Sequence, residues 1–196
     1  MAGLFSALLF IKFGLSIQLI FMFILVMSLI VVTFIDLEHM IIPNVVTYPG
    51  IIVGLLYNGL LTDFHSAGVL IDNFQLNFYY IMYLLDEIKI FNALFGIIVG
   101  GGSLLLIGFM YKKVRQIDGL GLGDVKLLAM IGAFLGWRSI IFVALVSSLL
   151  GTIIGLSIAL YRKDNLKYAI PYGPFLAFAA TVYCFSGDLS LDYFYN

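Results

Sequence analysis

The sequence predicts an all-α fold, a polytopic integral membrane helical bundle with about six to seven transmembrane helices. Of its 196 residues, 63% are hydrophobic and 11% are charged. Soluble globular domains have roughly 45–50% apolar and about 25% charged residues, so this composition excludes that class. Ten basic and eleven acidic residues nearly cancel, so no excess charge attracts nucleic acid. The one cysteine, Cys184, excludes a disulfide framework and a cysteine-based zinc site within this sequence.

Six apolar runs are expected to form the spans. Four of them are uncharged and close to the length of about 20 residues that a bilayer requires: 19–35, 45–61, 91–110 and 139–161. Two shorter runs, 125–137 and 170–185, are expected to be tilted or partly buried spans, because neighbouring protein can cover a short helix. Residues 1–14 are apolar but too short for an ordinary span, and they lack the basic start of a signal peptide. They are therefore predicted to form a short or truncated first helix.

The segment 62–89 is predicted to be an outer loop with an interfacial helix. Its apolar residues follow helical spacing from Phe74 to Leu85, and the charged residues Asp86 and Glu87 follow directly. This pattern is typical of an amphipathic helix lying in the membrane interface. We therefore expect one membrane-embedded domain over 1–196, with the lipid bilayer as its surroundings.

Basic residues indicate the orientation, because cytoplasmic loops carry an excess of Lys and Arg. If the spans alternate, one side receives the loops 36–44, 112–126 and 162–169. These loops hold seven of the ten basic residues, namely Lys112, Lys113, Arg115, Lys126, Arg162, Lys163 and Lys167. The sequence thus predicts a multi-pass protein of the inner (cytoplasmic) membrane with these loops in the cytoplasm.

Two acidic residues are candidates for chemistry. Asp36 ends the first long apolar run, and Asp124 follows a glycine-rich stretch where the next apolar run begins. An ionisable residue at membrane depth is expensive, so it is a functional hypothesis by default. The structural alternatives are a helix N-cap for Asp124 and a helix-end acid wetted by water for Asp36. Both acids are expected on the same side and at the same depth, where their carboxylates can meet.

A carboxylate pair is suited to peptide hydrolysis without a metal or other cofactor. Two adjacent carboxylates cannot both ionise, so one stays a base while the other keeps its proton. The base then activates a water molecule, and the acid protonates the leaving amine. Gly121 and Gly123 are predicted to hold an unwound backbone that lines a water-filled substrate cavity.

At these residues the sequence resembles the type IV prepilin peptidases, membrane aspartic peptidases with a Gly-x-Gly-Asp signature. Three blocks carry the resemblance: IDLEHMIIPN at 35–44, GLGLGDVKLLAMIGAFLGW at 119–137 and PYGPFLAFAA at 171–180. It implies an endopeptidase that cleaves the leader of type IV prepilins or type II secretion pseudopilins at the cytoplasmic membrane face. The family's catalytic aspartates correspond to Asp36 and Asp124. Supporting positions within the blocks are Pro43, Asn44, Lys126, Pro171, Gly173 and Pro174.

The sequence also departs from the family. Many bacterial members have a further N-terminal span and a cytoplasmic module with two Cys-x-x-Cys pairs, which this sequence lacks. It therefore looks like a minimal member or a piece of a longer one, and we expect no zinc requirement and little or no methylation of pilins.

Three other functions stay open at this point, together with the particular substrate and the oligomeric state. A presenilin-type protease also uses Gly-x-Gly-Asp, but it pairs this motif with Tyr-Asp, whereas Ile35 precedes Asp36 here. An ion-coupled transporter would place its acids near the bilayer midplane. A binding or assembly subunit would show no proteolysis.

Overall fold

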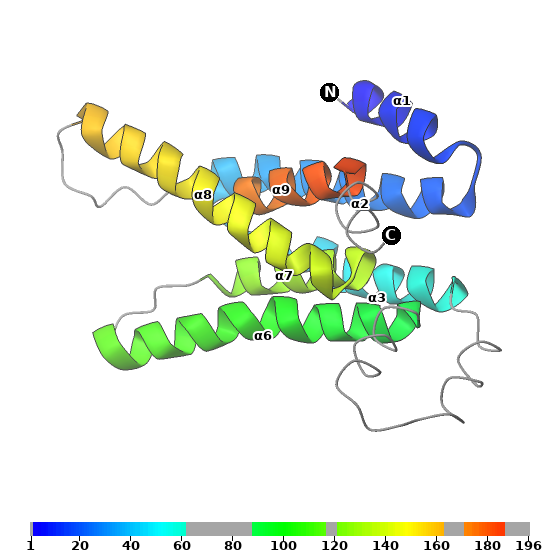
Figure 1. The fold of residues 1–196 in the computed structure, drawn as a ribbon. Helices are drawn as coiled ribbons and strands as arrows, with labels where there is room; N and C mark the ends of the chain where they lie inside the picture. The colour runs from blue at the N-terminus through cyan, green and yellow to red at the C-terminus, as the bar shows by residue number, and fades with distance from the viewer. Residues whose placement is uncertain (1, 62–87, 117–120, 163–170, 187–196) are drawn as a thin grey trace, which may run out of the picture. The chain divides into compact units, whose positions relative to one another are not determined.

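Residues 2–61, 88–116, 121–162 and 171–186 are described by a computed structural model (Figure 1). Their secondary structure is seven α-helices, which confirms the all-α class. Three of these helices are long and apolar enough to cross a membrane, at Ile17–His39, Lys89–Val114 and Trp137–Ile158. The predicted interfacial helix lies outside the described residues.

Internal contacts group the chain into two compact units. The terminal unit comprises Met1–Val46 and Ile141–Asn196, and the central unit comprises Thr47–Ile140. A single membrane-embedded domain over 1–196 stays a prediction. The helices of the terminal unit are α1 (Ala2–Phe13), α2 (Ile17–His39), most of α8 (Trp137–Arg162) and α9 (Gly173–Ser186). Those of the central unit are most of α3 (Asn44–Leu60), α6 (Lys89–Arg115) and α7 (Leu122–Leu135).

The core of the terminal unit is the antiparallel pair of α2 and α9, which pack along each other (Figure 1). Gly173, the first residue of α9, lies against Asp36 near the end of α2. Near the other end of α9, the Sγ atom of Cys184 lies 3.8 Å from the Sδ atom of Met22 in the first turns of α2. The buried residues of α2 recur every three or four positions and form one stripe: Met22, Leu25, Val26, Leu29, Val32 and Asp36.

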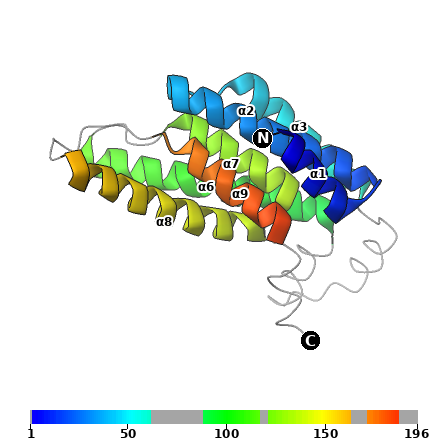
Figure 2. The same ribbon diagram turned by 90° about the horizontal axis from the view of Figure 1, so that it is seen from above.

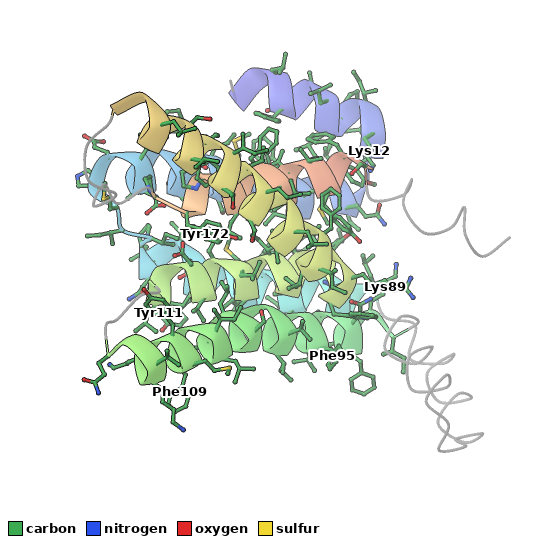
Figure 3. All side chains as sticks on the ribbon, turned by 60° about the vertical axis from the view of Figure 1, so that its left-hand side comes forward. Lys12, Lys89, Phe95, Phe109, Tyr111 and Tyr172 are labelled. Atoms are coloured by element: carbon green, nitrogen blue, oxygen red, sulfur yellow. The ribbon has the colours of Figure 1, made fainter. Side chains whose placement is uncertain are left out.

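The short helix α1 is attached to the C-terminal end of α9. Lys12, in the last turn of α1, donates hydrogen bonds from Nζ to the backbone oxygens of Cys184 (2.9 Å) and Phe185 (3.1 Å) (Figure 3). The last carbonyls of a helix lack partners within the helix, and a lysine at that end satisfies them. The rings of Phe5 and Phe185 stack beside this cap. Residues 2–13 of the segment 1–14 are thus helical, and a short or truncated first helix stays a prediction.

The core of the central unit is α7, which lies between α3 and α6 (Figure 2). Its buried residues, Val125 and Leu127–Phe134, surround the helix on all sides, as in a helix covered by protein. Glycines permit the close approach of its neighbours. A Cβ atom on Gly54 of α3 would lie 2.9 Å from the carbonyl carbon of Ala133, and one on Gly100 of α6 would lie 2.7 Å from the Leu128 carbonyl oxygen.

We expect Gly132→Ala to destabilise the central unit by about 1–3 kcal/mol, because the new methyl group overpacks the contact between α6 and α7. A Cβ atom on Gly132 would lie 2.5 Å from the carbonyl carbon of Gly96 and 3.1 Å from its Cα atom. Gly102→Ala is the matched control, since no atom lies within 4 Å of a Cβ there and alanine favours a helix by about 1 kcal/mol. Thermal unfolding in detergent should show a lower midpoint for the first variant only.

The structure corrects the predicted apolar segment 125–137. The helix begins earlier, at Leu122, and ends at Leu135, and Trp137 already begins α8. Gly136 separates the two helices with a φ of 78°, a backbone conformation that glycine adopts most readily. The Oδ1 atom of Asn92 accepts a hydrogen bond from the Trp137 backbone N–H at 3.0 Å and holds this turn against α6. The prediction was wrong because hydropathy alone does not reveal the break at Gly136 between two apolar helices.

Candidate active site

Asp36 is buried in the terminal unit. The helix α2 continues through it to His39, and Met40 ends the helix by donating its backbone N–H to the Asp36 carbonyl oxygen at 2.9 Å. Because Asp36 continues the buried stripe of α2, it faces the packed interior and is only 4% exposed. The alternative of a helix-end acid wetted by water is therefore wrong. A buried acidic side chain requires a hydrogen-bond partner.

That partner is the backbone of Gly173. Its N–H donates to the Asp36 Oδ2 atom at 3.0 Å. The amides at the start of a helix lack acceptors within the helix, and the positive end of the helix dipole favours a carboxylate there. The flanking residues Pro171 and Pro174 carry no N–H, and the Phe175 N–H donates to the Tyr172 carbonyl oxygen. Gly173 is thus the amide that this helix start presents to Asp36.

Only glycine fits at position 173. A Cβ atom there would lie 2.6 Å from the Asp36 Oδ2 atom and 3.2 Å from the Cδ1 atom of Ile42. The missing side chain lets the backbone approach the carboxylate closely. The structure therefore brings two of the three sequence blocks together, the one around Asp36 and the one that contains Pro171, Gly173 and Pro174.

Asp124 lies in the central unit, in the first turn of α7. The N-cap residue is Gly121, and the Asp124 backbone N–H donates to the Gly121 carbonyl oxygen at 3.1 Å. The Asp124 carboxylate folds back toward the helix start, with Oδ2 3.2 Å from the place that a Cβ atom on Gly121 would take. Asp124 is thus not the N-cap itself. It occupies the third helical position, where the positive end of the helix dipole also stabilises an acidic side chain.

The predicted unwound backbone is wrong for Gly123 but not for Gly121, which precedes the helix. Gly123 is helical and belongs to α7, and Gly121 has φ −69° and ψ 125°, an extended conformation open to any residue. Glycine weakens a helix by about 1 kcal/mol, and the packing of α7 outweighs this cost. That these glycines line a substrate cavity stays a prediction.

The remaining predicted residues lie at helix starts. The Pro43 carbonyl oxygen accepts the Val46 N–H at 3.1 Å, and Asn44 is the first residue of α3. The Lys126 Nζ atom lies 5.2 Å from the centre of the Tyr48 ring, within the range of a cation–π contact. In the described ranges, no group of three His, Cys, Asp or Glu residues could hold a metal ion.

Sequence reasoning missed Tyr172 and Ser147. Tyr172 lies at the start of α9 (Figure 3). Its Oη atom is 2.7 Å from the Oγ atom of Ser147 on α8. Pro171 and Pro174 were a usable signal, because they carry no N–H and so leave the Tyr172 and Gly173 amides to bind an acceptor outside the helix.

Together, the fold and the site define a helical membrane protein that buries an aspartate near the end of a candidate span. The chain belongs to the type IV leader peptidase family, whose sequence profile matches residues 23–156. The matched segment contains both Asp36 and Asp124 and ends before the block at 171–180. This membership confirms the resemblance and decides against the presenilin-type and transporter alternatives.

Curated relatives agree with the family. Proteins named prepilin leader peptidase/N-methyltransferase are 34% identical over 160 residues in Aeromonas hydrophila and 33% identical over 185 residues in Legionella pneumophila. These matches cover 82% and 93% of this chain, but 47% and 55% of the relatives. The chain thus spans about half the length of these relatives. No solved structure matches it. That this chain methylates poorly stays a prediction.

Proposed function

We propose that this chain is an aspartic endopeptidase that cleaves the leader of type IV prepilins or type II secretion pseudopilins at the cytoplasmic membrane face. The single observation that carries the proposal is Asp36, an acid that is buried in a candidate span and accepts the Gly173 N–H on its Oδ2 atom. Family membership and the names of the curated relatives support the same activity.

In the proposed reaction, Asp36 and Asp124 act as one pair. The ionised carboxylate takes a proton from a water molecule, whose oxygen attacks the carbonyl carbon of the scissile peptide bond. The protonated carboxyl stabilises the developing oxyanion, and a proton passes to the leaving amine as the C–N bond breaks. The products are a carboxylic acid and a free amine, and no cofactor is consumed.

The proposed substrate has a basic leader, a glycine before the cut and then a hydrophobic helix. Such a substrate suits a membrane enzyme, since its apolar helix lies in the bilayer while the leader stays in the cytoplasm. The direct test is incubation of a prepilin of this type with membranes that contain the chain. Release of the leader supports the proposal, and an intact prepilin contradicts it when membranes with a known prepilin peptidase process the same preparation.

We further propose six to seven spans, with the loops at 36–44, 112–126 and 162–169 in the cytoplasm, as the basic residues indicate. Single cysteines at Asn44 and Gln116, in a Cys184→Ser background, should react with an impermeant thiol reagent only from the cytoplasmic side. Asn44 is exposed at the start of α3, and Gln116 is exposed at the end of α6. Labelling of either position from the outer side would contradict the orientation and the placement of the site.

A further inference from the structure

A short chain of hydrogen bonds ties the start of α9 to α8 in the terminal unit. The Tyr172 Oη atom lies 2.7 Å from the Ser147 Oγ atom and 3.3 Å from the Ser148 Oγ atom of α8, and either oxygen of each pair can be the donor. The Ser147 Oγ atom also donates to the Ala144 carbonyl oxygen at 3.2 Å. Ser147 is completely buried. The bond to Tyr172 is partly buried, and a lower local dielectric strengthens such a hydrogen bond.

The Tyr172 ring is also placed by packing. A Cβ atom on Gly151 of α8 would lie 3.8 Å from Cε2 of Tyr172 and 3.6 Å from Cδ2 of Phe175, which are ordinary contact distances. Both rings of this helix start therefore lie close to the α8 backbone. The packing of the ring and the hydrogen bond of the hydroxyl together restrict the conformation of the Tyr172 main chain.

The main chain of Tyr172 in turn sets the direction of the Gly173 N–H. The Tyr172 carbonyl oxygen accepts from the Phe175 N–H at 3.1 Å and from the Leu176 N–H at 3.2 Å, so Tyr172 begins the first turn of α9. The next amide is that of Gly173, which donates to Asp36 Oδ2. A continuous series of bonds thus runs from the α8 carbonyl of Ala144 to the Asp36 carboxylate.

We propose that Tyr172 is a positioning residue of the peptidase: through its bond to Ser147 it holds the Gly173 amide on one oxygen of Asp36. This proposal rests on the proposed function. With Oδ2 held, the Asp36 carboxylate keeps one orientation, and Oδ1 remains for the reaction. A catalytic carboxylate that turns away from the productive geometry loses rate without losing affinity for the substrate.

The test compares Tyr172→Phe and Ser147→Ala with Ser157→Ala, a matched control on the same helix whose hydroxyl bonds only the carbonyl of its own turn. We expect kcat for prepilin cleavage to fall about tenfold in the first two variants, the factor that one hydrogen bond is worth. KM should stay unchanged, and the thermal midpoint should fall only slightly, as expected for one lost hydrogen bond. The Tyr172→Phe/Ser147→Ala double variant should be hardly slower than Tyr172→Phe alone, because that change already removes the bond to Ser147 together with the 3.3 Å contact to Ser148.

Hydrogen–deuterium exchange supplies a second readout that does not depend on activity. In a peptide covering 171–176, the prolines carry no amide hydrogen, so the signal comes from Tyr172, Gly173, Phe175 and Leu176. We expect faster exchange in Tyr172→Phe and Ser147→Ala, and wild-type exchange in Ser157→Ala.

Each outcome decides something. Unchanged exchange in Tyr172→Phe overturns the proposal. Faster exchange with an unchanged kcat also overturns it, because the bond would then stabilise the helix start without serving the reaction. A raised KM at constant kcat overturns it in favour of substrate binding. If the wild-type protein cleaves no prepilin while exchange rises in both variants, the proposed function fails and the hold on Gly173 is supported.

Discussion

Asp36→Asn or Asp124→Asn alone is expected to abolish leader cleavage, with a loss of turnover of several orders of magnitude. Asparagine has nearly the size of aspartate but supplies neither a carboxylate base nor an acidic proton. Because the two acids are proposed to act as one unit, the double variant should be hardly worse than either single one. The measurement is the rate of prepilin cleavage in membranes that contain equal amounts of each variant.

The matched control for the aspartates is Glu38→Gln. Glu38 is in the same helical turn as Asp36, but its side chain is 79% exposed, and its Oε2 atom lies 4.0 Å from the Nδ1 atom of His39. This variant should cleave at the wild-type rate. If either asparagine variant cleaves a prepilin at nearly the wild-type rate, the proposal that Asp36 and Asp124 form the catalytic pair is wrong. If Glu38→Gln lowers the cleavage rate equally, the acidic residues of this region stabilise the fold and do not act in the reaction.

Gly173→Ala is the second change with a large expected effect, a fall in kcat of about 100-fold. The new Cβ atom would lie 2.6 Å from the Asp36 Oδ2 atom, so the carboxylate or the start of α9 must shift. A displacement of about 1 Å costs roughly that factor when a reacting group must be aligned. The free energy of unfolding should fall by about 1–3 kcal/mol, as in other overpacked sites.

Gly151→Ala serves as the control for that change. It adds the same methyl group close to α9, but the nearest atoms lie at ordinary contact distances, so cleavage and stability should change little. Gly173→Ala with wild-type turnover would show that the contact between the Gly173 amide and Asp36 does not matter for the reaction. Equal losses in both variants would point to general sensitivity of the packing between α8 and α9.

Much of the fold and part of the site follow from local sequence patterns. Long uncharged runs predict helices such as α2, and the acids at the ends of such runs are rare enough to single out Asp36 and Asp124. These features depend on residues close together in the chain, which is why a sequence reveals them. The burial of Asp36 was not predictable in this way, because the run before it is apolar on all sides and the buried stripe from Met22 to Val32 is known only from the structure.

Contacts between distant segments were not predictable in the same way. The donor to Asp36 is a backbone amide 137 positions away, and every residue type except proline carries such an amide. The helical state of Gly123 depends on the packing of α7, which outweighs the weak helix propensity of glycine. The turn at Gly136 depends on Asn92 of another helix. Composition does not record such partners.

The buried position of α7 has a consequence for biosynthesis. Its 14 residues extend for about 21 Å, while the hydrocarbon layer of a bilayer is about 30 Å thick. A helix this short, with Asp124 and Lys126 in its first turns, is a poor independent substrate for the translocon. The backbone contact between Gly96 and Gly132 offers it a partner that is made immediately before it. We therefore expect α6 to wait beside the translocon until α7 emerges, so that both helices enter the lipid as one hairpin.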